Sequence, residues 1–385
     1  MRELEKRTWA EISLDNLRHN VQAIRAALPE GCRFLGVVKA NAYGHGSRQV
    51  SRTLAACGAD YLAVSCLDEA MELRDGGVSL PILILGHTPV EYTRLLTEND
   101  FTQTVTSLEA AEAYSQECVR FGRRLRVHLA LDTGMSRLGF LCTGAHFAAG
   151  VEEAAQACAL PNLEAEGVYT HFAVSDLPGA ENEAYTREQF RVFLAATEAL
   201  RARGFALPLR HCANSGAVLH YPEFALDMVR PGILLYGYGD AENRLGLKPC
   251  MRFVSKITTV KEYDAGTAVS YGRRFTAEKP VRIGVVGAGY ADGLPRILSN
   301  RCAFAVGGGF APQRGSICMD MCMIDLTELP ACGEGDEVEL FGPANPLEPL
   351  AETAQTISYE LLCAVSRRVP RVYKNFSNDP VPTRD

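Results

Sequence analysis

Residues 34–46 read FLGVVKANAYGHG, an apolar run that ends in a lysine and a polar, glycine-containing loop. A short apolar run bounded by turn residues is typical of a buried strand in a parallel sheet. Seven further runs of this kind follow along the chain. They are YLAVS from Tyr61, PILILG from Pro81, FTQTV from Phe101, LRVHLALD from Leu125, EAEGVYTHFA from Glu164, LRHCANS from Leu209 and DMVRPGILLYG from Asp227.

Amphipathic segments lie between these apolar runs. In SLDNLRHNVQAIRAAL, Ser13 can cap a helix whose apolar face starts at Leu14. TREQFRVFLAATEALRARG predicts another helix, which ends near Gly204. Eight strands alternating with helices over residues 1–240 predict a (β/α)8 barrel of the TIM type, whose usual length is about 250 residues. An open doubly wound sheet is the alternative, but eight consecutive units favour closure.

The sequence changes character after Gly237. A polar, glycine-rich junction, GYGDAENRLGLKP, leads into strand-like runs separated by turn residues. These runs are FVSKITTVKEY, VRIGVVGAGY, CAFAVGGG and DEVELFG, followed by a short helical pattern, AETAQTISYELLCAV, and a last strand, RVYKNF. We therefore predict a mostly-β second domain over residues 241–385.

The composition is that of a soluble globular protein. The chain has 385 residues, of which 47% are hydrophobic and 22% charged, and a net charge of −7. No block of like charges suggests nucleic-acid binding, and no apolar run approaches the roughly 20 residues of a membrane helix. The 13 cysteines lack zinc-site spacing and the N-terminus lacks a secretory signal. We therefore expect free thiols, no metal and a cytoplasmic location.

Lysine is scarce in this chain. Seven lysines stand against 32 arginines, and Lys39 is the only lysine between Lys6 and Lys248. A lysine that merely extends from a strand end to solvent is one explanation. A lysine beside an apolar wall can also have a lowered pKa and act as a nucleophile or base. Arginine cannot replace lysine in a Schiff base, so the isolation of Lys39 favours the chemical role.

Residues after two other strands are of the types that bind a phosphate group. Residues 214–216 (Asn-Ser-Gly) open a helix after the seventh run, and residues 230–233 (Arg-Pro-Gly-Ile) follow the eighth. Barrels often bind phosphate with the loops after strands seven and eight. Simple capping and turning is the alternative reading of both segments.

Three further residues are candidates for the same mouth of the barrel. Tyr43 follows Lys39 by four residues, His171 ends the sixth run, and Arg137 follows the fifth and can bind a carboxylate bidentately. A packed aromatic, a core histidine and a surface arginine are the alternatives. Taken together, the lysine, phosphate loops, arginine and histidine point to a phosphorylated carbonyl cofactor, and pyridoxal phosphate fits best.

These motifs resemble those of alanine racemase. The likeness covers essentially the whole chain, and its motifs occur in the family's order. They are VVKANAYGHG (37–46), DTGMSRLG (132–139), THFA (170–173), ANS (213–215), VRPGILLYG (229–237), SYG (270–272), GYADG (289–293), CMD (318–320) and TISYE (356–360).

The resemblance implies a homodimeric isomerase that interconverts L- and D-alanine and supplies D-alanine for peptidoglycan. Lys39 would hold pyridoxal phosphate as a Schiff base and act as one catalytic acid/base, and Tyr271 of the partner subunit would be the other. The remaining cofactor-binding residues would be Tyr43, His171, Asn214, Ser215, Arg230, Gly232, Ile233 and Tyr359. Arg137, Met319 and Asp320 would bind substrate, and Asp176, His211, Tyr290 and Arg296 would line the entrance.

The implied chemistry is consistent with these residue types. Racemisation removes a Cα proton from one face and returns one to the other, so two bases on opposite faces are needed. A tyrosine, with an ordinary pKa of about 10, needs a neighbouring cation such as Arg137. Arg230 stays protonated, so it would leave the pyridine nitrogen neutral and discourage long-lived carbanions.

Two positions depart from the family pattern. The family often carries a carbamylated lysine two residues before the DTG aspartate, where this chain has Ala130. Alanine cannot form a carbamate, so Arg137 must be oriented otherwise, for example by chloride or water. Ser316 stands where some members have arginine, which could alter the entrance.

Three other functions remain open at this point. A serine or broad-specificity racemase of the same fold is the nearest, although Tyr359 matches the alanine-preferring pattern. A related amino-acid decarboxylase would place an acidic residue at the pyridine nitrogen, where this chain has Arg230. A pyridoxal-phosphate carrier protein would resemble residues 1–240 only.

Overall fold

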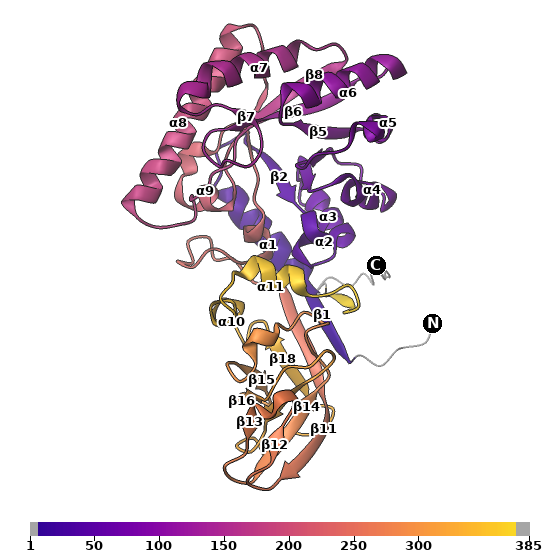
Figure 1. The fold of residues 1–385 in the computed structure, drawn as a ribbon, viewed down its shortest axis with the longest axis vertical. Helices are drawn as coiled ribbons and strands as arrows, with labels where there is room; N and C mark the ends of the chain where they lie inside the picture. Colours follow the sequence, from indigo (N-terminus) through magenta and orange to yellow (C-terminus); the bar gives the residue numbers. More distant parts are fainter. Residues whose placement is uncertain (1–6, 375–385) are drawn as a thin grey trace. The chain divides into compact units, whose positions relative to one another are not determined.

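The computed structural model describes residues 7–374, which divide into two compact units (Figure 1). The barrel unit comprises residues 17–42 and 47–248, and the β unit comprises the described parts of residues 1–16, 43–46 and 249–385. The boundary at residue 240 drawn from the sequence stays a prediction. Within residues 7–374, no helix combines the length and apolar character needed to cross a membrane.

The barrel unit confirms the predicted (β/α)8 architecture. Each of the eight apolar runs forms a strand, and neighbouring strands pair in parallel in the order β10-β2-β3-β4-β5-β6-β8-β9. The seam between β9 and β10 is closed by backbone hydrogen bonds from Asp227 to Arg210 (3.1 Å) and from Arg230 to Ala213 (2.9 Å). The strands are β2 (Arg33–Val37), β3 (Tyr61–Val64), β4 (Ile82–Ile84), β5 (Phe101–Val105), β6 (Leu125–Asp132), β8 (Leu163–Tyr169), β9 (Leu209–His211) and β10 (Met228–Val229), with β7 (Phe140–Leu141) beside β6.

Helices follow the barrel strands, as the amphipathic patterns predicted. The Ser13 hydroxyl accepts a hydrogen bond from the Asn16 N–H (3.1 Å), so it caps the first helix. Gly204 adopts a φ of +92° just beyond the end of α8. The helices are α1 (Leu14–Ala26), α3 (Ser47–Ala56), α4 (Leu67–Asp75), α5 (Thr93–Glu98), α6 (Leu108–Phe121), α7 (Phe147–Ala159), α8 (Ala180–Ala202) and α9 (Ser215–His220).

The β unit is built on a mostly antiparallel sheet. Its strand order is β14-β17-β16-β15-β18-β11-β1-β19, and an added β14–β11 pairing closes six of these strands on themselves. The strands are β1 (Thr8–Ser13), β11 (Met251–Tyr263), β14 (Val281–Val286), β15 (Ala303–Val306), β16 (Gly309–Arg314), β17 (Cys322–Asp325), β18 (Glu337–Phe341) and β19 (Arg371–Lys374), and β12 (Ala268–Val269) pairs with β13 (Phe275–Thr276).

Three details of this unit differ from the sequence pattern. Residues 8–13, expected with the barrel, form β1, which pairs with β11 and β19. The helical pattern after residue 350 is two helices, α10 (Leu347–Thr353) and α11 (Ser358–Ala364), because Gln355 breaks it with a φ of +58°. RVYKNF begins as β19, while its residues 375–376, like Lys6, lie outside the described residues. All 13 cysteines are free thiols.

Candidate active site

Lys39 lies two residues past the end of β2, at the carboxyl end of the barrel strands, where (β/α)8 enzymes carry their functional groups. The next residues, 40–42, form the turn α2 (Lys39–Tyr43) with φ of 51° to 54° and ψ of 48° to 52°, which is left-handed geometry. Such geometry costs about 1–2 kcal/mol for each residue that is not glycine. Strain of this kind concentrates at functional sites. The turn therefore marks Lys39 as a candidate for chemistry.

Three hydrogen bonds within the barrel unit hold this strained turn. The Ala40 N–H donates to Glu69 Oε1 (2.6 Å) and the Ala42 N–H to the Val38 carbonyl (2.9 Å). The Asn41 Oδ1 accepts from the Ser47 N–H at the start of α3 (2.7 Å). Because these bonds come from different elements, they fix the backbone that carries Lys39.

Arg230 follows β10 and is buried, with 4% of its surface exposed. Its Nη1 donates to the His211 carbonyl (2.7 Å) and lies 3.0 Å from His211 Nδ1, and its Nη2 donates to the Thr170 carbonyl (2.8 Å). Within residues 7–374 its hydrogen-bond partners are carbonyls and imidazoles, and no carboxylate pairs with it directly. Burial lowers the pKa of this guanidinium. A cation held by neutral groups is suited to donate to a ring nitrogen.

His171 lies close enough to the other residues predicted at the barrel mouth to interact with them electrostatically. Its Nδ1 lies 3.3 Å from Arg230 Nη2. Burial and then, in decreasing order, the positive charges of Arg230, Arg137 and Lys39 together lower the pKa of His171 to about 3. The imidazole is therefore neutral at neutral pH, and three cationic side chains lie within electrostatic range of it.

The two loops predicted to bind phosphate are joined to each other. The Ser215 hydroxyl accepts a hydrogen bond from the Gly232 N–H (2.9 Å). Asn214 caps α9 through its Oδ1, which accepts from the Ala217 N–H (3.0 Å). Ser215 and Ile233 are buried. The capping reading of Asn214 is thus correct, and it is compatible with a phosphate role for its neighbours.

The β unit brings Tyr43 and Tyr359 together, with ring centroids 5.8 Å apart. Tyr43 is 7% exposed, and burial followed by the proximity of Tyr359 and Cys363 raises the pKa of its phenol. The Tyr43 hydroxyl is therefore a neutral donor at physiological pH.

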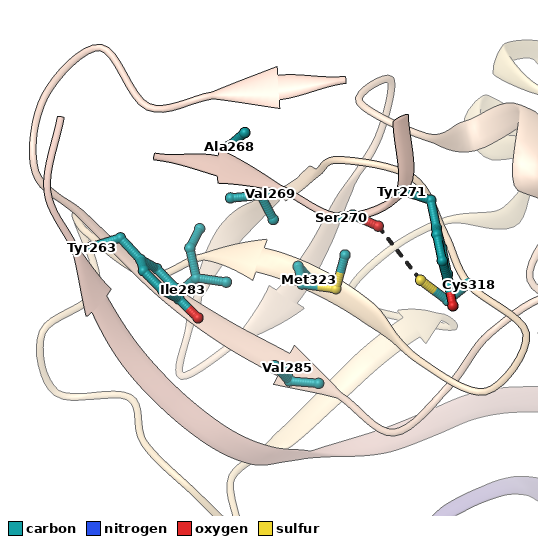
Figure 2. A pocket seen from close by; sticks show the side chains of 9 residues that line it. All are labelled: Tyr263, Ala268, Val269, Ser270, Tyr271, Ile283, Val285, Cys318 and Met323. Carbon is teal, nitrogen blue, oxygen red and sulfur yellow. Dashed lines mark hydrogen bonds between the residues drawn. The ribbon is translucent and has the colours of Figure 1, made fainter. Parts of the chain in front are cut away.

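Tyr271 lies on a tightly held turn of the β unit and is 74% exposed (Figure 2). The Ser316 hydroxyl donates to the Tyr271 carbonyl (2.8 Å), and the Ser270 hydroxyl donates to the Ser316 carbonyl (2.7 Å). Ser270 itself has a φ of +69°. Ser316, a departure from the family pattern, therefore supports the turn that carries Tyr271. An apolar cavity of about 410 Å³ lies beside it, lined by Tyr263, Val269, Ile283, Cys318 and Met323 among others.

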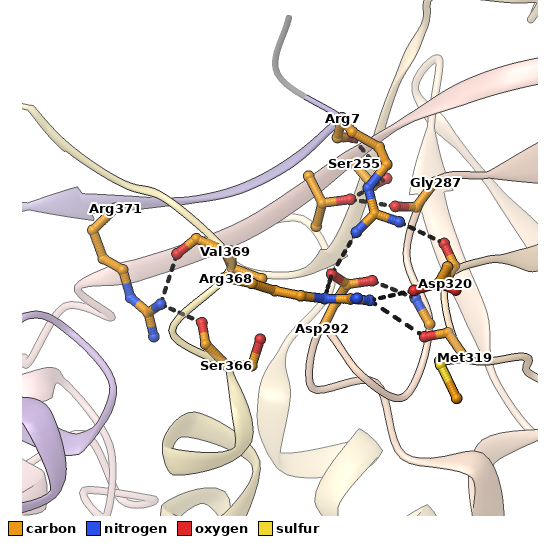
Figure 3. Close-up of polar contacts among 12 residues, drawn as sticks. Arg7, Ser255, Gly287, Asp292, Met319, Asp320, Ser366, Arg368, Val369 and Arg371 are labelled. Carbon is orange, nitrogen blue, oxygen red and sulfur yellow. Dashed lines mark hydrogen bonds and ion pairs between the residues drawn. The ribbon is translucent and has the colours of Figure 1, made fainter. Parts of the chain in front are cut away.

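A buried carboxylate organises the loops that carry Tyr290, Met319 and Asp320 (Figure 3). Asp292 Oδ1 accepts from Arg7 Nη2 (2.6 Å) and Arg368 Nε (2.8 Å), and its Oδ2 accepts from the Gly289 N–H (2.9 Å). Arg368 also pairs with the Asp320 carboxylate (2.8 Å). One carboxylate thus links two loops through two arginines.

His211 does not lie at an entrance, where the sequence pattern placed it. It is fully buried, it stacks on Tyr169 with ring centroids 5.0 Å apart, and it contacts Arg230. It lies at the end of β9, where its ring nitrogen and its carbonyl both contact the Arg230 guanidinium. The other three expected entrance residues, Asp176, Tyr290 and Arg296, are exposed.

Sequence reasoning missed His128 and Glu166 in the barrel and Asp292 in the β unit. His128 interrupts the otherwise apolar LRVHLALD, and a polar residue inside a buried strand was the available signal. Asp292 had no comparable signal, because the aspartate of GYADG sits in a glycine-rich loop where exposed acids are common.

Asp292→Asn is expected to lower the free energy of unfolding by about 2 kcal/mol. The loss is smaller than for a fully buried pair because the Arg7 and Arg368 side chains are 41% and 42% exposed. Urea unfolding of the two proteins measures it. Asp320→Asn is the control, since its carboxylate is 48% exposed and its loss should stay below about 1 kcal/mol. Equal losses in both variants would contradict the central role of Asp292.

This fold, with a lysine after the first barrel strand and a buried arginine after the last, is that of a (β/α)8-barrel enzyme, with Lys39 as the candidate site residue. Residues 12–240 match the family model described as alanine racemase, N-terminal domain, and residues 250–373 match the model of the C-terminal domain. The chain therefore belongs to the alanine racemase family.

Individual relatives agree with this assignment. An alanine racemase of Clostridium perfringens is 42% identical over 374 residues, which cover 95% of each protein. The solved alanine racemase of Clostridium difficile 630 superimposes with a TM-score of 0.93 at 37% identity, covering 100% of this chain and 99% of that one. A structure of the same protein in complex with cycloserine gives a TM-score of 0.90 at 36% identity.

Proposed function

We propose that this chain is a pyridoxal-phosphate-dependent racemase that interconverts L- and D-alanine. The observation that carries the proposal is the strained, left-handed turn after Lys39 at the barrel mouth, together with membership of the alanine racemase family. The relatives bear the name alanine racemase. The 13 free cysteines fit a reducing, cytoplasmic location.

The donor set fits pyridoxal phosphate. Lys39 offers a primary amine for the aldehyde, Arg230 a buried N–H donor for the pyridine nitrogen, and Ser215 a hydroxyl for the phosphate. Tyr43 offers a neutral phenol, and the ring of Tyr359 lies beside it. We propose His171, Asn214, Gly232 and Ile233 as supporting residues of the same cofactor. When bound, the cofactor withdraws electrons from the substrate's Cα–H bond.

The protein's own groups then move the proton. We propose that the Lys39 amine holds or delivers a proton at Cα from one face, and that the Tyr271 phenol does so from the other. Tyr271 would reach the site of the partner subunit in a homodimer, which matches its exposed position on a rigid turn. Arg230, hydrogen-bonded to neutral imidazole and carbonyl groups, would donate to the ring nitrogen without protonating it.

Substrate binding is assigned to Arg137, Met319 and Asp320, and the entrance to Asp176, Tyr290 and Arg296. Arg137 would bind the substrate carboxylate. Ala130, on β6, is 3% exposed and offers no amine for a carbamate. We propose that an anion such as chloride, or water, orients Arg137 instead.

L-Alanine is expected to be racemised with a higher kcat/KM than L-serine by the purified, cofactor-loaded protein. A hydroxymethyl side chain is larger and more polar than methyl, and Tyr359 matches the alanine-preferring pattern. Formation of each D-amino acid, followed by a D-amino-acid oxidase assay, measures the ratio. A higher kcat/KM for serine would overturn the substrate assignment, and carbon dioxide release from ornithine, lysine or diaminopimelate would replace racemase by decarboxylase.

A further inference from the structure

A chain of polar side chains runs through the interior of the barrel unit and ends at Glu166 on β8. The Glu166 Oε1 accepts hydrogen bonds from the Tyr61 hydroxyl (2.8 Å) and the Thr102 hydroxyl (3.1 Å). These donors come from β3 and β5, which are not neighbours of β8 in the sheet. The carboxylate therefore lies inside the barrel, where it meets side chains from across it.

Two buried imidazoles connect this carboxylate to Arg230. His128 Nε2 lies 3.4 Å from Glu166 Oε1, and His128 Nδ1 lies 2.8 Å from His211 Nε2. On its other side, His211 Nδ1 lies 3.0 Å from Arg230 Nη1. Both imidazoles are fully buried. The sequence of contacts is thus Arg230, His211, His128, Glu166.

Only one arrangement of protons satisfies this chain. A guanidinium can only donate, so His211 Nδ1 must accept and His211 must carry its proton on Nε2. That N–H donates to His128 Nδ1, which leaves the His128 proton on Nε2. This buried nitrogen lies 3.4 Å from Glu166 Oε1, within ion-pair distance of the carboxylate but without a hydrogen bond of good geometry to it. Burial lowers the pKa of both histidines, so both are neutral, while donors from His128, Tyr61 and Thr102 outweigh burial and lower the pKa of Glu166 to about 2.

The surrounding packing is shaped to the two imidazoles. A Cβ on Gly167 would come within 2.7 Å of the His128 ring, so only glycine leaves room for it beside β8. Tyr169 stacks on His211 with an interplanar angle of 22°. Arg126 also acts on Glu166 electrostatically, but its own guanidinium pairs with the Asp100 carboxylate. Among the described residues, the chain from Arg230 ends on a carboxylate that has no direct arginine partner.

We propose that Glu166 and His128 are positioning residues that act through His211 on Arg230. The Arg230 guanidinium at one end can only donate, and the Glu166 carboxylate at the other can only accept, so the two ends favour the same proton arrangement between them. By stabilising the proton on His128 Nε2, the carboxylate keeps His211 Nδ1 as an acceptor for Arg230, so that the remaining Arg230 N–H bonds keep a fixed direction at the barrel mouth. The catalytic consequence rests on the proposed function, in which Arg230 faces the cofactor's pyridine nitrogen.

Glu166→Gln is the first test, because an amide can donate to His128 as well as accept from it. If the side-chain amide of E166Q donates to His128 Nε2, the His128 proton moves to Nδ1 and the His211 proton to Nδ1. That proton would then face the N–H donor of Arg230, which conflicts with the arrangement that Arg230 requires. With 15N-labelled histidine, the wild-type protein should show both rings as Nε2–H tautomers, with or without cofactor. E166Q should show loss or mixing of these tautomers and about a tenfold lower kcat with little change in KM. Tyr61→Phe is the control, since it keeps the carboxylate, and it should keep the wild-type tautomers.

A pair of variants at His128 tests the same idea independently of the folding of E166Q. A glutamine there can accept from His211 and donate to Glu166, so His128→Gln should keep the His211 tautomer and most of kcat. His128→Leu breaks the chain and should lose both. Wild-type tautomers in E166Q, or equal behaviour of H128Q and H128L, would overturn the proposal. If the wild-type protein fails to racemise alanine, the proposed function fails. The tautomer measurement would still test whether Glu166 and His128 position Arg230.

Discussion

Lys39→Ala is expected to lower kcat/KM for L-alanine by a factor on the order of 10³ or more. The same variant should lose the near-ultraviolet and visible absorbance of bound pyridoxal phosphate. Lys39 has two proposed tasks, binding the aldehyde and moving a proton at Cα. An alanine side chain can perform neither of them. Absorbance spectra and D-alanine formation by the purified variant measure the two losses separately.

Two further variants make this result specific. Lys39→Arg keeps the positive charge but offers no amine for an aldehyde, so it should fail in the same way as alanine. Lys279→Ala is the control, because Lys279 is an exposed lysine of the β unit, 3.6 Å from Glu328. It should keep both absorbance and activity. Retention of the cofactor absorbance in Lys39→Ala would mean that another amine binds the aldehyde.

The barrel was predictable because its strands are buried on both faces and therefore read as continuous apolar runs. The same pattern located Lys39, His171 and Arg230, since each immediately follows such a run. The assignment of residues 8–13 was not predictable in this way. β1 pairs with β11 and β19, more than 230 residues away, and no local pattern reports so distant a partner.

The left-handed turn after Lys39 was also beyond sequence reasoning. Ala40 and Ala42 favour a right-handed helix, and Asn41 alone of the three is a residue that often adopts φ near +50°. Two local hydrogen bonds, to Val38 and from Ser47, and one bond to the distant Glu69 hold this geometry. The chain from Arg230 to Glu166 was hidden for a related reason. Alternation along β6 and β8 can assign His128 and Glu166 to a face, but only the closed barrel brings them together.

Tyr271→Phe is expected to lower the rate of racemisation by a factor on the order of 10³ and to do so asymmetrically. Phenylalanine keeps the ring and removes only the hydroxyl. Lys39 would still remove a proton from one face of Cα and return it to that face. One enantiomer of alanine should therefore exchange its Cα proton with solvent deuterium without inversion, which proton NMR detects. Tyr263→Phe is the control, since Tyr263 lines the cavity beside Tyr271 and has no proposed catalytic role.

Mixing the two inactive variants tests where Tyr271 acts. If each site takes Lys39 from one subunit and the tyrosine from its partner, a hybrid dimer of Lys39→Ala and Tyr271→Phe has one intact site and one doubly altered site. Random reassociation makes half of the dimers hybrid, so activity should recover to about a quarter of the wild-type value. Separately, each variant stays inactive. If the mixture also stays inactive although hybrid dimers form, Tyr271 acts within its own subunit, because the shared-site arrangement requires that one of the two hybrid sites hold both bases.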